Sequence, residues 1–169
     1  IRVKDFEWRR SFRRIIKKND NISLRLAPLQ FKEEHFSLYL AYQSARHRGD
    51  GMDDSDPVKY QQFMTNSEID SFMMELRDGD RLLAVSVLDR VVDGLSAVYT
   101  FFEPAEDHRS LGTLAILRQI DLALSAGHDY LYLGYWISDC SKMSYKERFS
   151  PLEEFDTNAQ LWLLHPSVR

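Results

Sequence analysis

Four consecutive residues, Arg109-Ser110-Leu111-Gly112, stand at the start of a long apolar-periodic stretch and have the types needed to bind an anion. Backbone N–H groups at a helix start, together with an arginine, form a ready anion site. A glycine there lets a ligand approach the main chain closely. Because short motifs of this kind also occur in turns that merely cap a helix, spacing alone leaves both interpretations open.

The first 18 residues carry a concentrated positive charge. They hold eight lysines and arginines against two acidic residues, a net charge of +6, whereas the whole chain has a net charge of −4 at pH 7. Trp8, Phe12, Ile15 and Ile16 recur at helical spacing among these cations, which predicts a short amphipathic basic helix. Such a helix either contacts nucleic-acid phosphates or is simply solvated, and charge alone does not choose between them.

The elements that would position these residues follow from periodicity and turn residues. Asp78-Gly79-Asp80 and Asp93-Gly94 separate apolar runs, so they predict hairpins and an antiparallel meander of three strands. The predicted strands are 22–26, 69–77, 81–92, 95–104, 129–136 and 161–164, and the predicted helices, besides the basic one, are 31–48, 57–64 and 110–126. This order favours an α/β or α+β layer fold with helices on both faces of a mainly antiparallel sheet.

Length and composition set the broad class. The 169 residues, 44% of them hydrophobic, suit one catalytic domain, which we assign to 21–169 behind a basic amphipathic segment at 1–20. No apolar run reaches the roughly 20 residues that cross a bilayer, and no secretory signal is visible at the start. The single cysteine excludes a disulfide within the chain. These features favour a cytoplasmic protein that does not insert into a membrane.

Several uncommon strings occur in a fixed order along the chain. They are YQSARHRGDGMDDSD (42–56), DGLSAVYTFFEP (93–104), RSLGTLAILRQI (109–120) and YLYLGYWISDCSKMSYKERFSPLE (130–153). Together they closely resemble the carboxy-terminal domain of arginyl-tRNA–protein transferases and of their bacterial relatives, the aspartate/glutamate leucyltransferases. The resemblance covers residues 1–165 and implies a Gcn5-related acyltransferase-like fold. Relatives also carry a cysteine-bearing amino-terminal domain, linked in some to an iron–sulfur or metal site, which has no counterpart here.

The resemblance implies a reaction and its partners. The compact bacterial form transfers leucine from leucyl-tRNA to proteins that begin with Asp or Glu, and arginine transfer from arginyl-tRNA is the alternative. We expect no cofactor in this chain. We also expect no coenzyme A, because RSLG supplies only one of the glycines usual in the pyrophosphate-binding loop of acetyltransferases, and Thr113 follows it. An acetyl-coenzyme A-dependent N-acetyltransferase and a non-catalytic module that binds amino termini or tRNA remain alternatives.

The implied chemistry is aminolysis of an activated ester, which needs positioning, a proton acceptor and stabilisation of an oxyanion. Glu103 is the first candidate for binding or deprotonating the amine, with Tyr99 beside it in the catalytic set. Many relatives have Asp in place of Glu103, and a surface carboxylate before Pro104 is the alternative interpretation. Cys140 is expected to be structural, because aminolysis needs no covalent nucleophile.

Cations and aromatic residues of the same strings are the candidates for binding. Arginine offers a bidentate partner for an acidic side chain, and aromatic rings can stack on unpaired tRNA bases. The alternatives are solvated charges and packing within the sheet. The residues expected to bind the substrates are Arg46, His47, Ser96, Tyr135, Lys142, Tyr145 and Lys146. The residues expected to bind tRNA are Arg9, Arg10, Arg13, Arg14, Arg109, Ser110 and Gly112.

Overall fold

The computed structural model describes residues 1–46, 56–137 and 143–165. Its centre is a five-stranded sheet in the order β1-β2-β3-β4-β5. The strands are β1 (Ile22–Pro28), β2 (Ser71–Asp78), β3 (Arg81–Val91), β4 (Gly94–Phe102) and β5 (Tyr130–Tyr132). The strands β1 to β4 pair antiparallel with one another, whereas β5 pairs parallel with β4. The predicted three-strand meander is confirmed as β2, β3 and β4.

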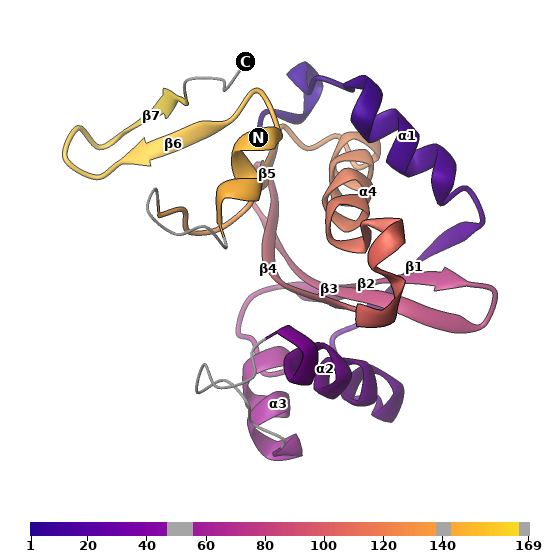
Figure 1. The fold of residues 1–169 in the computed structure, drawn as a ribbon. Coiled ribbons are helices and arrows are strands. Elements are labelled where there is room, and N and C mark those ends of the chain that lie inside the picture. The colour runs from indigo at the N-terminus through magenta and orange to yellow at the C-terminus, as the bar shows by residue number, and fades with distance from the viewer. Residues whose placement is uncertain (47–55, 138–142, 166–169) are drawn as a thin grey trace.

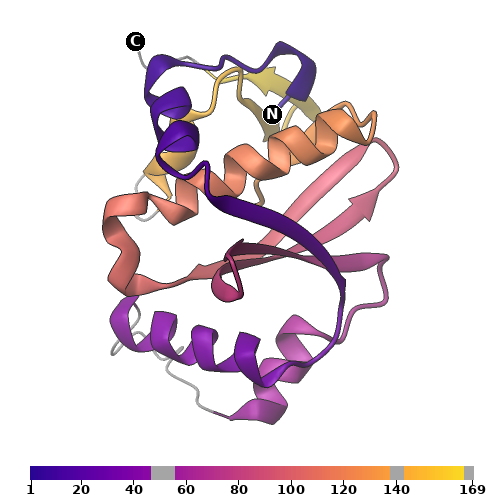
Figure 2. The ribbon, with the colours of Figure 1, turned by 90° about the vertical axis from the view of Figure 1, so that its right-hand side faces the viewer.

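Helices cover both faces of this sheet (Figures 1 and 2). On one face lie α1 (Arg10–Lys18) and α4 (Leu111–Ser125), and on the other lie α2 (Glu33–Arg46) and α3 (Pro57–Met64). Three short 3-10 helices are η1 (Val3–Asp5), η2 (Pro104–Arg109) and η3 (Ser144–Arg148). The strands β6 (Glu153–Asp156) and β7 (Leu161–Leu164) form a separate antiparallel hairpin. The α/β architecture with helices on both faces is as the sequence predicted.

Two hydrophobic cores lie between these layers, one on each face of the sheet. Successive side chains of a strand point to opposite faces. On β2, Met74 and Leu76 therefore pack toward α1 and α4, while Met73 packs toward α2 and α3, and all three are fully buried. Phe12 of α1 joins the first core and stacks on Phe149 with ring centroids 5.2 Å apart. The basic segment at the start of the chain is thus packed onto the sheet through its apolar face.

The strand β5 is shorter than the predicted run 129–136, and the cause lies in Gly134. Its φ of +75° belongs to the left-handed region, which does not continue a strand. The sheet pairing therefore ends at Tyr132, and the chain leaves the edge of β4. The predicted strand 95–104 ends at Phe102, and residues 105–109, predicted as a loop, belong to η2, because Glu103 caps this helix and Pro104 occupies its first position.

Gly94 follows the turn between β3 and β4, and it also allows β4 and β5 to approach each other closely. A Cβ atom at this position would lie 2.3 Å from the carbonyl oxygen of Tyr130. No side chain fits at that distance, so β5 pairs with the start of β4 only because residue 94 is a glycine. The Asp93-Gly94 pair, which predicted a hairpin, therefore meets two requirements: the turn between β3 and β4, and the close contact between β4 and β5.

A buried charged cluster fixes α2 to the sheet. Glu75 of β2 is 3% exposed and accepts hydrogen bonds from Lys32 and His35, each at 2.8 Å, and from Arg77 at 2.7 Å. Arg77 also donates to Glu34 of α2. Burial alone would raise the pKa of the Glu75 carboxyl, but the hydrogen bonds from Lys32, Arg77 and His35 lower it to about 2. The cluster holds the start of α2 on β2, and α2 carries part of the site described next.

Candidate active site

The strand β4 continues beyond the end of β5. Only Gly94 to Ser96 pair with β5, and among the described residues no strand pairs with β4 from Ala97 to Phe102 on that side (Figure 1). We call this stretch, residues 97–102, the open edge. Val98 lies opposite a register shift in β3, so a β-bulge interrupts the strand where the open edge begins. An unpaired strand edge presents N–H and C=O groups that can pair with another chain, and bulges are frequent beside active sites.

The second half of α2 flanks the open edge on one face of the sheet. The Tyr42 ring contacts the Phe102 ring at 4.9 Å, and the guanidinium of Arg46 lies 5.5 Å from the centre of the same ring. Arg46 also donates to Asp107 at 3.1 Å. Tyr99, on the open edge itself, packs beside Tyr39. One predicted cation, Arg46, and one predicted tyrosine, Tyr99, thus both lie along the second half of α2.

The start of α4 flanks the open edge on the other face. A Cβ atom on Gly112 would lie 3.0 Å from Cε1 of Phe102, so a glycine is needed for this close contact. Ser110 before the helix has a φ of 56°, in the left-handed region, and its side chain makes no capping hydrogen bond. The first helical hydrogen bond runs from the N–H of Leu114 to the carbonyl of Ser110. The N–H groups of residues 111–113 precede it and are available at the helix start.

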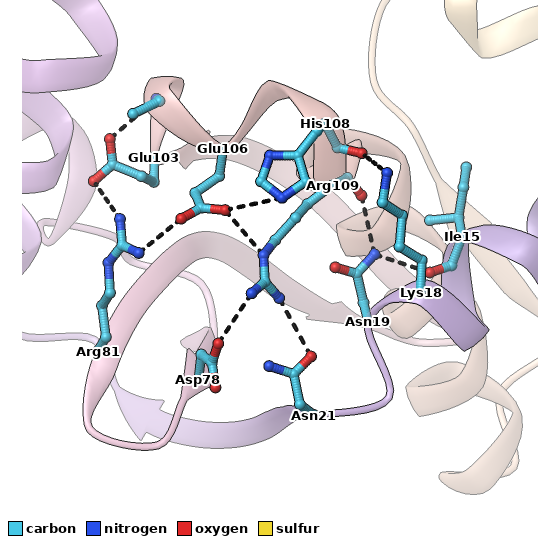
Figure 3. A network of polar contacts seen from close by, with 11 residues as sticks. Ile15, Lys18, Asn19, Asn21, Asp78, Arg81, Glu103, Glu106, His108 and Arg109 are labelled. Atoms are coloured by element: carbon cyan, nitrogen blue, oxygen red, sulfur yellow. Dashed lines mark hydrogen bonds and ion pairs between the residues drawn. The ribbon is translucent and has the colours of Figure 1, made fainter.

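The side chain of Arg109 is held within the protein (Figure 3). Its guanidinium donates to Glu106 at 2.9 Å, to Asp78 at 3.1 Å and to Asn21 at 3.3 Å. Only 17% of the side chain is exposed. Arg109 therefore ties the turn before α4 to the β2–β3 turn and to the start of β1. These contacts indicate that Arg109 stabilises the conformation of that turn. The anion-binding role predicted for Arg109 stays a prediction.

Lys146 anchors η3 to the segment that leaves the sheet after β5. Its Nζ atom donates to the main-chain carbonyls of Leu133 at 2.7 Å and Tyr135 at 2.6 Å. The residue is buried, and burial lowers the pKa of its ammonium group. Tyr145, one residue earlier, is 43% exposed and lies near Tyr42. Lys146 thus positions Tyr145 beside α2, and its ammonium group is used by carbonyl groups of the protein.

The hydroxyl groups gathered near the open edge stay protonated at neutral pH. Burial raises the pKa of Tyr42, Tyr99 and Tyr145 above the ordinary value of a phenol. A neutral phenol donates a hydrogen bond and is a poor base. The arrangement is suited to stabilising a developing oxyanion and to positioning a main chain, and these are the needs of acyl transfer between two bound substrates.

The remaining predicted residues are placed as follows. Glu103 caps η2 by accepting from the N–H of Ala105 at 3.2 Å, with Arg81 3.7 Å away. It lies four residues beyond Tyr99, roughly 13 Å along a strand, so the two do not form one proton-transfer pair. Ser96 sits where β4 still pairs with β5, and Tyr135 is 90% exposed. His47, Cys140 and Lys142 lie outside the described residues.

The basic residues of α1 and its N-cap residue, Arg9, divide into two groups. Arg9 donates to Glu7 and to Ser150, so its side chain has partners within the protein. Arg10, Arg13 and Arg14 are exposed. Lys18 at the end of α1 donates to the carbonyl of His108, and this joins the basic helix to the turn before α4.

Two residues beside the open edge were not among the sequence candidates. Tyr42 and Gln43 belong to the first of the uncommon strings but were not assigned a role. A signal was available for Gln43, because it is a polar residue within the apolar stripe of a predicted helix. Such a residue is buried in a layer fold, and a buried amide needs a partner.

The fold and the open edge place this chain in a class. A mainly antiparallel sheet with helices on both faces and a parallel fifth strand is the architecture of the Gcn5-related acyltransferase-like fold. A family model described as arginine-tRNA-protein transferase, C terminus, matches residues 34–156. The chain therefore belongs to the arginine-tRNA-protein transferase family.

Bacterial relatives are similar over most of the chain. A protein of Thiobacillus denitrificans is 48% identical over 153 residues, which are 90% of this chain and 64% of the relative. Proteins of Chromobacterium violaceum and Methylobacillus flagellatus are 44% and 47% identical, each over 89% of this chain and over 62% and 61% of their own lengths. All three are named aspartate/glutamate leucyltransferase. The chain spans about three fifths of the length of these relatives.

Proposed function

We propose that this chain forms the catalytic part of an enzyme that transfers leucine from leucyl-tRNA to the amino terminus of proteins beginning with Asp or Glu. The relatives' names supply the substrates, and the family supplies the class of reaction. The structural observation that supports the proposal is the open edge of β4, which is flanked by α2 and by the start of α4. It offers main-chain groups for an extended acceptor and protonated hydroxyls for the reacting ester.

In the proposed reaction, the nitrogen of the acceptor α-amine attacks the ester carbonyl carbon of the leucyl group. A C–N bond forms, the C–O bond to the tRNA breaks, and the proton of the amine passes to the departing ribose oxygen or to water. A free α-amine has a pKa near 8, so a weak base is enough at neutral pH. Tyr99 and Tyr145 would donate to the oxyanion, and Arg46 would pair with the acidic side chain of the acceptor.

We propose that tRNA lies across α1 and the start of α4. Arg10, Arg13 and Arg14 are exposed on α1, and Lys18 links its end to the turn before α4. The N–H groups of residues 111–113 are placed to receive a phosphate there. In this arrangement Arg109 would act on the phosphate indirectly, since it holds the turn in shape. The reaction as proposed uses no cofactor and no coenzyme A.

The cytoplasm is the compartment we propose, because charged tRNA is made and used there. No helix in the described part of the chain is long and apolar enough to cross a membrane. Among the same residues, no group of three or more His, Cys, Asp and Glu side chains is arranged to hold a metal ion.

A transfer assay tests the proposal. The full-length protein is supplied with leucyl-tRNA or arginyl-tRNA and with peptides that begin with Asp, Glu, Arg or Ala. We expect leucine on the Asp and Glu peptides only. Arginine transfer to the same peptides would change the amino acid and leave the class intact, whereas no transfer from either tRNA, with micromolar binding of acetyl-coenzyme A, would contradict the proposal.

A further inference from the structure

A buried amide beside the open edge has one end without a partner. Gln43 of α2 is 2% exposed. Its Nε2 atom donates to the hydroxyl of Tyr39 at 2.7 Å, but its Oε1 atom is buried and accepts no hydrogen bond among the described residues. A buried carbonyl without a donor costs stability, and such groups in folded proteins usually serve a purpose.

The side chains of Tyr39 and Tyr99 lie beside this amide, and the Phe101 ring packs against both tyrosines. Tyr39, Tyr99 and Phe101 lie within 6.4 Å of one another by their ring centres, and the Tyr99 side chain is close enough to Gln43 to interact with it. None of the cation–ring contacts of the described residues involves these three rings. The faces of aromatic rings attract cations, and a carbonyl oxygen accepts hydrogen bonds from an N–H group. The combination suits a small cation with N–H groups.

The amide lies next to the open edge, because its neighbour Tyr99 belongs to that edge. Tyr99 is only half-buried and belongs to the strand that carries that edge. Binding at the Oε1 atom of Gln43 requires the Tyr99 side chain to turn aside, so that a substrate lying along β4 can reach the amide.

We propose that Gln43 binds a primary ammonium or amine group of a substrate through Oε1, with the rings of Tyr39 and Tyr99 around it. The inference rests on the proposed function, in which both substrates carry such a group. These are the α-amine of the leucyl residue on the tRNA and the amino terminus of the acceptor. Gln43 would thereby help the enzyme to select substrates whose α-amine is free.

The test compares Gln43→Met with Gln119→Met. Gln119 is the matched control, because it is also a fully buried glutamine with an unpartnered side chain but lies on α4 in the other core. Two quantities are measured for the full-length protein. One is the affinity for leucyl-tRNA relative to tRNA carrying 4-methylpentanoate, which lacks only the amine, and the other is the KM for an Asp peptide.

If Gln43 binds the leucyl amine, wild-type protein prefers leucyl-tRNA, and Q43M loses about tenfold of that preference. If it binds the acceptor, Q43M raises the KM for the peptide by about tenfold and keeps the tRNA preference. Tyr39→Phe, which removes the hydrogen bond to the amide but keeps the packing, changes the same quantity in the same direction to a smaller extent. It takes the place of Q43M if that variant does not fold. Q119M changes neither.

Two results would overturn the inference in different ways. The role of Gln43 is refuted, and the proposed function is not, if wild-type protein transfers an amino acid and Q43M matches it in both quantities. Tyr39→Phe takes the place of Q43M in this comparison if Q43M does not fold. Wild-type protein that transfers neither amino acid refutes the proposed function, and the contact with Gln43 falls with it.

Discussion

Replacing Glu75 with glutamine tests whether the buried cluster fixes α2 to the sheet. The substitution keeps the size of the side chain and removes its charge. Three donors converge on the Glu75 carboxylate, from Lys32, His35 and Arg77. In E75Q an amide N–H₂ group must face at least one of these donors, so a buried donor loses its partner. We therefore expect a clear loss of stability.

The magnitude follows from the pKa of Glu75. A fall from the ordinary 4.5 to about 2 corresponds to about 3 kcal/mol of stability at neutral pH. Lys32 is one-third exposed, so solvent screens part of that interaction and about 2 kcal/mol remains. For a domain of this size, this loss lowers the melting temperature by roughly 4–8 °C.

The sign of the pH dependence is fixed by the direction of the shift. Because the pKa is lower in the folded state, the contribution of Glu75 is complete above about pH 4.5 and is lost as the pH falls toward 2. The melting temperatures of wild type and E75Q should therefore differ fully at pH 7 and converge below pH 4.5.

Thermal unfolding at pH 7, 5, 4 and 3 provides the measurement. Glu34→Gln is the matched control, because Glu34 pairs with the same arginine but is about half exposed, and its loss should cost under about 1 kcal/mol. A drop of less than about 2 °C for E75Q at pH 7, or a difference from wild type that stays constant down to pH 3, would refute this account.

Three further predictions concern the site and its supports. Lys146→Met removes two hydrogen bonds to main-chain carbonyls and should lower the melting temperature by roughly 5 °C, whereas unchanged stability would favour a role in substrate binding alone. Reversing the charge of Arg13 and Arg14 should weaken tRNA binding and reduce its slope against log salt by roughly 1.5, and an unaltered affinity would remove α1 from the tRNA site. Gly94→Ala places a methyl group against the carbonyl of Tyr130, so we expect the largest loss of stability of the set, and a wild-type melting curve would contradict the close strand contact.

Periodicity and turn residues were sufficient to predict most of the fold. The strands, the helices on both faces and the basic helix follow from local patterns, since an element must bury its apolar side. The direction of the Arg109 side chain could not be predicted, because Asp78 and Asn21, two of its partners, come from segments more than 30 residues away. The same holds for Lys146, whose carbonyl partners became free only because β5 ends early.

The open edge of β4 has a consequence for the range of proteins that such an enzyme can modify. Main-chain N–H and C=O groups are identical in every polypeptide. The open edge would therefore pair with the main chain of an acceptor whatever the sequence of that acceptor. On the proposed binding mode, discrimination is concentrated in the first residue of the acceptor, and the rest of the segment needs only to be extended. Unrelated proteins would then become equivalent targets as soon as cleavage exposes the same terminal residue.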